Sequence, residues 1–295
     1  MAAPATDALL RARVEKVLAS TPLIDGHNDL PWEIRDRFAS KLERIDLSKD
    51  TAHLATDAAS SLVIPGQLKP APAPLMTDIP RMRTGRMGGQ FWSVWIPTDV
   101  QGPRAVEMTL EQIDLVKAMA ERYPADFQMA YTAADIERAH AAGHIACLIG
   151  IEGGHQIDGS LPVLRQMYAA GARYMTLAHF TNTAWADSAT DAPAHNGLTP
   201  FGKAVVAEMN RLGMLVDLSH VSAKTMRDAL AVSQAPVIFS HSGAFTIDHS
   251  PRNVPDDVLA LVAKNGGVVM VNFFPGYVSE GVRAWNADLA AEDAR

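Results

Sequence analysis

Seven short apolar runs recur along the chain, and segments with helical periodicity separate them. Near-continuous apolar runs are typical of strands covered on both faces of a parallel sheet. Between the runs, capping residues, first-turn prolines and terminal glycines mark where helices begin and end. The strands expected from this pattern cover residues 22–26, 89–97, 145–151, 173–178, 214–218, 236–240 and 268–273.

The helices expected between these strands begin at caps that the sequence shows. Thr109 and Gln112 form a capping box, which predicts a helix from residue 109 to about residue 123. Thr199 and Pro200 begin another helix, which ends at Gly213. The remaining expected helices cover residues 7–19, 132–143, 160–171, 222–232, 255–266 and 281–295.

This alternation predicts an α/β fold with a parallel sheet. Polar, ligand-type residues follow several strands, whereas an open doubly wound sheet gathers its ligands at one switch point. We therefore expect a TIM-type (β/α)8 barrel. Only residues 274–295 follow the seventh strand, so the eighth strand is missing from the expected set. Either the barrel is open or the chain has been cut short.

Residues 33–88 are expected to form one long excursion above the first strand that helps to cover a site. Prolines in the stretch 64–74 exclude a helix or a central strand there. Because the excursion lacks a core of its own, we expect residues 1–295 to form a single domain.

Composition and charge limit the classes of binding partner and the cellular locations that we expect. Hydrophobic residues make up 48% of the 295 residues and charged residues 20%, as in ordinary globular proteins. A net charge of -7 without a basic cluster argues against a nucleic-acid partner. No apolar run approaches the roughly 18 residues of a membrane span. The single cysteine, Cys147, excludes an intrachain disulfide. A cytoplasmic location is expected, or a periplasmic one if a leader was removed.

Metal-type ligands follow four of the apolar runs. His27 and Asp29 are two positions apart, so they would project from the same face of an extended strand. Glu152 ends the third run, and His220 and His241 follow the fifth and sixth. These residue types suit two zinc ions that share a water. The alternatives are a hydrogen-bonded pair near a turn for His27 and Asp29, and a solvated loop carboxylate for Glu152.

Other side chains would face the same mouth of the barrel. His179 ends the fourth strand, and we assign it to the substrate because five ligands already serve two metals. Arg252 lies on the loop after the sixth strand, where its guanidinium suits a bidentate grip on a carboxylate, or else a surface salt bridge. Tyr277 is a further expected substrate contact. Asp187 is explained equally well by a loop cap and by a functional role, and His155 either lies behind the ligands or is a loop residue.

These residues stand in motifs that resemble those of the renal or membrane dipeptidases, a binuclear zinc branch of the amidohydrolase-type barrels. The resemblance runs in order through roughly residues 20–280. The matching stretches are residues 25–32, 88–94, 149–155, 174–179, 182–187, 217–222, 239–242 and 252–257.

The resemblance implies a zinc-dependent dipeptidase that cleaves the peptide bond of dipeptides with a metal-bridging hydroxide. It implies that His27 and Asp29 hold one zinc ion and that Glu152 bridges the two ions. The second zinc ion would be held by His220 and His241. Glu152 and His179 would be the catalytic residues, with His179 at the scissile bond, while Arg252 would contact the terminal carboxylate.

The chain departs from the family at its C-terminal end. The family continues into an eighth strand with a Gly-x-Asp-Phe-Asp-Gly-like motif, whose first aspartate is thought to handle a proton of the bridging water, and this chain lacks that motif. It also lacks the leader, disulfides and lipid anchor of animal members. We therefore expect a bacterial, C-terminally incomplete relative, with a homodimer as one possible assembly. The alternatives are a binuclear amidohydrolase acting on a lactone, cyclic amide or phosphoester, and a catalytically incompetent truncated homologue.

Overall fold

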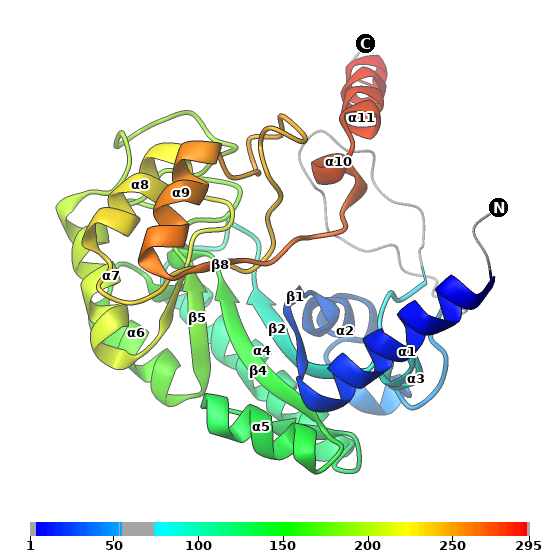
Figure 1. The fold of residues 1–295 in the computed structure, drawn as a ribbon. Coiled ribbons are helices and arrows are strands. Elements are labelled where there is room, and N and C mark those ends of the chain that lie inside the picture. Colours follow the sequence, from blue (N-terminus) through cyan, green and yellow to red (C-terminus); the bar gives the residue numbers. More distant parts are fainter. Residues whose placement is uncertain (1–3, 53, 55–73, 294–295) are drawn as a thin grey trace.

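A computed structural model of the chain shows a parallel sheet wrapped by helices (Figure 1). It describes residues 4–52, 54 and 74–293. Residues 64–73 of the proline-rich stretch, for which the sequence excludes helix and central strand, lie outside the described residues.

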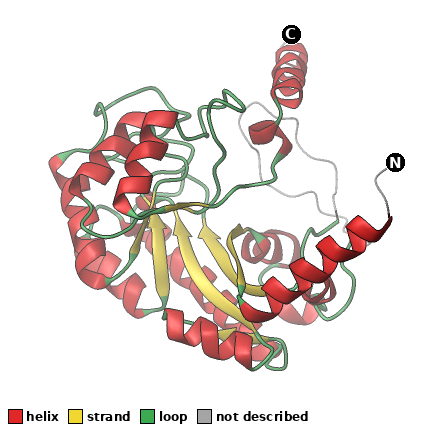
Figure 2. Cartoon of the chain, in the orientation of Figure 1, coloured by secondary structure: helices red, strands yellow, loops and turns green. Residues whose placement is uncertain are grey.

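The strands follow one another in chain order across the sheet, and each pairing is parallel. This confirms the predicted α/β fold of TIM type, and Figure 2 shows the sheet inside its layer of helices. After β8, the described part of the chain forms no further strand, so the sheet is a half-barrel. The seven strands that follow one another across the sheet are β1 (Leu23–Asn28), β2 (Met87–Trp95), β4 (Ile145–Glu152), β5 (Ala172–Thr176), β6 (Leu215–Asp217), β7 (Ile238–Phe239) and β8 (Val268–Val269).

The predicted strand set needs two corrections. A short strand, β3 (Phe127–Met129), was not predicted; it pairs with the beginning of β4 and is too brief to show an alternating pattern. The last strand, expected over residues 268–273, stops at Val269. Beyond it, Val271 and Phe273 are 63% and 90% exposed. With no strand paired on the outer side of β8 among the described residues, the chain leaves the sheet early.

The first strand also ends differently from the prediction. It stops at Asn28, and Asp29 has φ -86° and ψ 12°, which is not an extended conformation. Asp29 stands directly before α2 (Leu30–Phe38), whose first turn contains Pro31, a residue preorganised for that position. The alternation of side chains along a strand is therefore not what brings Asp29 toward His27.

Helices cover the outer face of the sheet, and α11 extends beyond it at the C-terminal end (Figure 1). The predicted caps Thr132, Ser160 and Thr199 each accept a backbone N–H of the following turn. No described helix combines the length and the apolar character that a membrane span needs. Besides α2, the helices are α1 (Pro4–Ser20), η1 (Leu42–Arg44), α3 (Ile79–Thr84), α4 (Pro103–Arg122), α5 (Ala133–Ala141), η2 (Gly154–Ile157), α6 (Leu161–Ala169), α7 (Pro200–Leu212), α8 (Ala223–Val232), α9 (Asp256–Asn265), α10 (Pro275–Val278) and α11 (Glu280–Asp293).

The capping box expected at Thr109 was wrong. Helix α4 begins at Pro103, so Thr109 lies inside it and its hydroxyl is 2.7 Å from the carbonyl oxygen of Ala105. Gln112 is buried rather than folded back onto the helix start. Pro103 favours an earlier first turn, and burial of Thr109 and Gln112 outweighs the local capping pattern.

The main hydrophobic core of the described residues lies between the sheet and the helices, and two smaller clusters accompany it. The described part of the 33–88 excursion contributes Ile34, Leu47 and Ile79 to this same core. It therefore packs as part of the barrel wall, while its role as a cover for the site stays a prediction. Ile149, in the middle of β4, is fully buried in the core.

We expect Ile149→Ala to lower the free energy of unfolding by about 2–5 kcal/mol, because the truncation leaves a cavity in a close-packed core. Leu110→Ala is the matched control, since Leu110 on α4 is 43% exposed and its loss leaves no internal cavity. Urea unfolding followed by circular dichroism measures both variants. Equal stability losses would show that β4 is not the tightly packed centre of the fold.

Candidate metal centre

All eight residues predicted for the site line a single cavity at the C-terminal ends of the strands. The cavity has a volume of about 700 Å³. It also reaches Phe273 and, at the beginnings of β1 and β2, Leu23 and Met87, so it extends along β1 on the side where the described residues form no strand after β8. The eight predicted residues in its wall are His27, Asp29, Glu152, His179, His220, His241, Arg252 and Tyr277.

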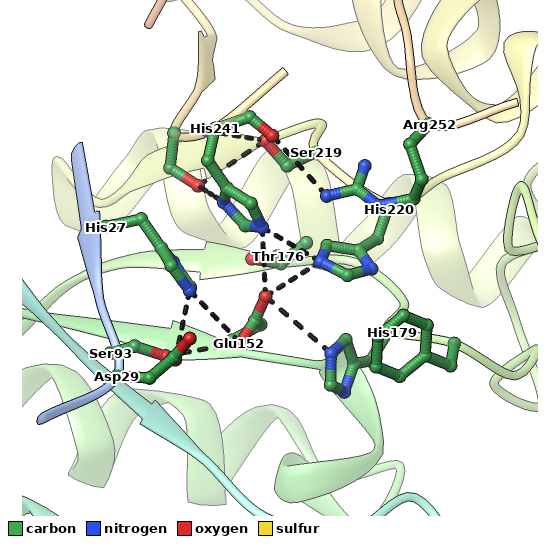
Figure 3. A network of polar contacts seen from close by, with 12 residues as sticks. His27, Asp29, Ser93, Glu152, Thr176, His179, Ser219, His220, His241 and Arg252 are labelled. Atoms are coloured by element: carbon green, nitrogen blue, oxygen red, sulfur yellow. Dashed lines mark hydrogen bonds and ion pairs between the residues drawn. The ribbon is translucent and has the colours of Figure 1, made fainter. Parts of the chain in front are cut away.

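Glu152 lies at the centre of this group, and four imidazoles point toward it (Figure 3). Its Oε1 is 2.8 Å from Nε2 of His220, 3.2 Å from Nε2 of His241 and 3.7 Å from Nε2 of His179. Its Oε2 is 3.5 Å from Nε2 of His27. The carboxylate is thus shared by both sides of the cluster.

Asp29 reaches the cluster from the beginning of α2. Its Oδ1 is 3.1 Å from Nε2 of His27, although the two residues do not share a strand. Ser93 on β2 donates a hydrogen bond of 3.2 Å to Oε2 of Glu152. The turn into α2 therefore provides the proximity that the sequence analysis attributed to strand alternation.

Two groups of donor atoms are each compact enough to hold a metal ion. One consists of His27, Glu152 and His241, and the other of Glu152, His179 and His220. Glu152 belongs to both, as expected for a bridging ligand. The grouping differs from the predicted one, which paired His220 with His241 and left His179 to the substrate. The division of ligands between two ions stays a prediction.

Burial keeps three of the imidazoles neutral. It lowers the pKa of His179, His220 and His241 well below the ordinary value, since the charged form loses its hydration. A neutral imidazole retains a lone pair on one ring nitrogen, and metals bind this neutral form. His220 also has a φ of 68°, a left-handed conformation that aims its side chain from the loop after β6.

The pKa values of His27 and Glu152 depend on each other's charge. Burial acts to lower the pKa of His27, but the carboxylates of Glu152 and Asp29 outweigh it and raise the pKa to about 9. Burial raises the pKa of Glu152 to about 7, although His27 opposes the shift. Burial thus disfavours the Glu152 carboxylate more than the positive charge of His27 favours it, so a further cation beside it would stabilise it.

These features fit a divalent cation. Nε2 of His220 and Nε2 of His241 are only 2.9 Å apart and both face Glu152. A buried carboxylate is costly without a cationic or hydrogen-bonding partner, and a metal ion supplies one. The donors are nitrogen and oxygen atoms, a set that suits zinc and related first-row ions.

Arg252 presents an unsatisfied guanidinium to the same cavity. Its side chain is 1% exposed, and among the described residues Nε and Nη1 have no hydrogen-bond partner. Nη2 donates to the carbonyl of His241 at 3.4 Å, and the Tyr277 ring lies 5.3 Å from Cζ. This burial argues against the surface salt bridge considered as its alternative.

Two other candidates lie outside the cavity wall. Asp187 accepts backbone N–H groups of Ala194, His195 and Gly197, which is the behaviour of a loop cap. His155 is buried in η2, and burial lowers its pKa to about 4.

Four buried polar residues without a predicted role lie beside the predicted ligands; three of them contact a ligand directly, and Asp217 contacts one of those three. Ser93 contacts Glu152, Tyr174 contacts His27, and Ser240 contacts both His241 and Asp217. The sequence could have indicated these residues, because polar residues within apolar runs beside a predicted ligand are expected to be hydrogen-bonded. The four residues are Ser93, Tyr174, Asp217 and Ser240.

The family described as membrane dipeptidase, peptidase family M19, matches residues 11–292 of the chain. This chain belongs to peptidase family M19. The match confirms the family predicted from the motifs. A bacterial origin and an incomplete C-terminal end stay predictions.

Individual relatives agree with this membership. Dipeptidase 3 of Mus musculus is 42% identical over 276 residues, which are 92% of this chain and 51% of that protein. The chain thus spans about half the length of this curated relative. The crystal structure of a dipeptidase AC, described as a metallopeptidase of family M19, is 26% identical with a TM-score of 0.71. The match covers 88% of this chain and 74% of that one.

A further solved structure supports the fold. It is a metallopeptidase from Rhodobacter sphaeroides, liganded with a phosphinate mimic of the dipeptide L-Ala-D-Ala. It is 24% identical, has a TM-score of 0.74, and the match covers 92% of this chain and 81% of that one.

Proposed function

We propose that this chain is a metal-dependent dipeptidase. The observation that carries the proposal is the arrangement around Glu152, where four imidazoles converge on one buried carboxylate beside the unsatisfied guanidinium of Arg252. A cavity of about 700 Å³ falls within the usual size of small-ligand sites. The names of the M19 relatives and the dipeptide mimic of the Rhodobacter sphaeroides structure support the same substrate class.

The proposed metal ligands come from four strand ends and one helix start, and we propose that they hold two Zn2+ ions. Such ions, when bound, supply a water that is activated for attack near neutral pH. Glu152 serves both ions because its two oxygens face different imidazoles. The five proposed ligands are His27, Asp29, Glu152, His220 and His241.

The remaining residues position the dipeptide. Arg252 binds the terminal carboxylate through the N–H groups that lack partners among the described residues, and Tyr277 covers its guanidinium plane. His179 lies on the side of Glu152 away from His27 (Figure 3). From there it would hydrogen-bond the oxygen of the scissile carbonyl. A carboxylate grip beside the metal centre limits the substrate to very short peptides.

The alternative functions predict different ligands for Arg252. A neutral lactone or cyclic amide has no carboxylate to satisfy a buried guanidinium, so the geometry favours the dipeptide. An incompetent homologue would bind metal without turnover. A homodimer, the absence of nucleic-acid and membrane partners, and a cytoplasmic location stay predictions.

Metal content and hydrolysis, measured on one preparation, test the proposal. We expect two zinc ions per chain by elemental analysis and hydrolysis of Ala-Ala, but little of Ala-Ala amide, because the amide cannot pair with Arg252. Removal of metal with a chelator should stop hydrolysis, and added zinc should restore it. Preferred cleavage of a lactone or a phosphotriester, or metal without any turnover, would favour the corresponding alternative.

A further inference from the structure

Asp217 ends β6 behind the proposed metal ligands and does not line the cavity. It is fully buried and accepts four hydrogen bonds. Its Oδ1 accepts the backbone N–H groups of Ser219 at 3.1 Å and Ser240 at 2.8 Å. Its Oδ2 accepts the hydroxyls of Thr176 at 2.5 Å and Ser240 at 2.7 Å. The carboxylate therefore holds the ends of β5, β6 and β7 together.

The hydroxyl of Ser240 therefore donates its proton in one defined direction. It has one proton, and the carboxylate of Asp217 at 2.7 Å is a stronger acceptor than the hydroxyl of Ser219 at 3.4 Å. With that proton directed to Asp217, the oxygen of Ser240 accepts from Nδ1 of His241, which is 2.9 Å away. The proton of the neutral imidazole then resides on Nδ1.

This direction leaves Nε2 of His241 with a lone pair that faces the metal centre. Nε2 is 3.2 Å from Oε1 of Glu152, which would otherwise favour a proton on Nε2. The contact with Ser240 opposes that arrangement, because Nδ1 without a proton could not donate to the hydroxyl. The chain from Asp217 through Ser240 thus selects the tautomer that a metal ion needs.

The outer nitrogens of the other three imidazoles have a longer hydrogen bond or none among the described residues. His27 Nδ1 is 3.3 Å from the hydroxyl of Tyr174, which donates to the carbonyl of Gly26. Among the described residues, Nδ1 of His179 and Nδ1 of His220 have no hydrogen-bond partner. His241 is therefore the imidazole of this cluster that is connected to a carboxylate by hydrogen bonds from its outer nitrogen.

We propose that Asp217 is a positioning residue of the metal centre, which acts through Ser240 to hold His241 with its proton on Nδ1 and its Nε2 toward the metal. The inference rests on the proposed function. Partners behind a metal-binding imidazole fix its orientation and raise its basicity. Asp217, which does not line the cavity, and Ser240, which lines it and contacts His241, should therefore govern metal affinity without being metal ligands.

Zinc affinity of the full chain tests this role. We expect Asp217→Asn and Ser240→Ala each to lower the affinity for zinc by about 10-fold to 100-fold in competition with a chromophoric chelator. Ser240→Thr retains a hydroxyl and should keep most of the affinity. Asp78→Asn and Ser160→Ala are matched controls, since Asp78 is a buried cap of α3 and Ser160 the cap of α6. Neither control lines the cavity, and both should bind zinc as the parent does.

A second readout detects the hydrogen bond directly. In the zinc-loaded parent, the Nδ1 proton of His241 should give an exchange-protected imidazole resonance in 15N-resolved NMR spectra. Ser240→Ala should lose this protection and Ser240→Thr should keep it, which decides the matter even if Asp217→Asn does not fold. Parent-like affinity together with a protected proton in Ser240→Ala would overturn the relay and leave the proposed function intact. A parent chain that binds no zinc would overturn the proposed function itself.

Discussion

Replacement of Glu152 by glutamine is expected to empty the metal centre and to stop dipeptide hydrolysis. The carboxylate lies within 3.7 Å of four imidazole nitrogens and is the one donor shared by both candidate metal groups. Removal of one member of a buried charged cluster costs about 3–5 kcal/mol, which corresponds to roughly 100-fold to 5,000-fold weaker metal binding. Because glutamine is nearly isosteric, the fold should remain.

Elemental analysis, hydrolysis of Ala-Ala and a thermal melt measure the effect of Glu152→Gln on one preparation. Glu208→Gln serves as the control, because the carboxylate of Glu208 pairs with Arg165 and Arg211 on the outer helices and its neutralisation leaves the cavity unchanged. Full metal content in Glu152→Gln would contradict the bridging role, and an unchanged melt in the absence of metal would show that the loss is not due to misfolding.

Arg252→Met should mainly weaken the binding of the substrate carboxylate. Arg252 is buried, and two of its nitrogens lack partners among the described residues, so its charge is available to the ligand. Loss of one partner from a buried, hydrogen-bonded charge pair costs about 2–5 kcal/mol, or about 30-fold to 5,000-fold in kcat/KM. We expect most of this loss as a higher KM, with a smaller fall in kcat if the carboxylate also orients the peptide bond.

The amide of the same dipeptide distinguishes this effect from a general disturbance. The parent should prefer Ala-Ala over Ala-Ala amide, and Arg252→Met should lose that preference. Arg173→Met is the matched control, because Arg173 also stacks on a tyrosine, with Cζ 4.4 Å from the Tyr168 ring, but does not line the cavity. Unchanged kinetics in Arg252→Met would exclude the carboxylate grip.

Local sequence patterns were sufficient where burial is continuous along the chain. The apolar run that forms β4 predicts a strand covered on both faces, and the structure shows that each of its residues is buried. Caps such as Thr132 and Thr199 act within one helical turn, so they too can be read from neighbouring residues. The predicted site residues are found in one cavity because parallel strands of a barrel end at the same mouth.

Local sequence patterns gave wrong predictions where constraints outside the motif determine the conformation. Thr109 has the spacing of a helix cap, yet burial in α4 and the first turn at Pro103 decide its place. Asp29 has the spacing of a strand ligand, yet it reaches His27 from the turn into α2. In both cases a packing or backbone constraint outside the motif outweighs the preference within it.

The amino-acid sequence thus specifies the parallel α/β architecture, the family and the residue types at the mouth of the barrel, because each depends on short-range patterns repeated at the strand ends. Tertiary structure decides which imidazoles share Glu152, that Arg252 is buried and unsatisfied, and that Asp217 holds Ser240 against His241. Glu152 is 27 to 125 positions away from the imidazoles around it, and Asp217 is 23 positions away from Ser240. The hydrogen bonds and the burial of these residues arise only when separate strands meet. They therefore cannot be predicted from short-range sequence patterns.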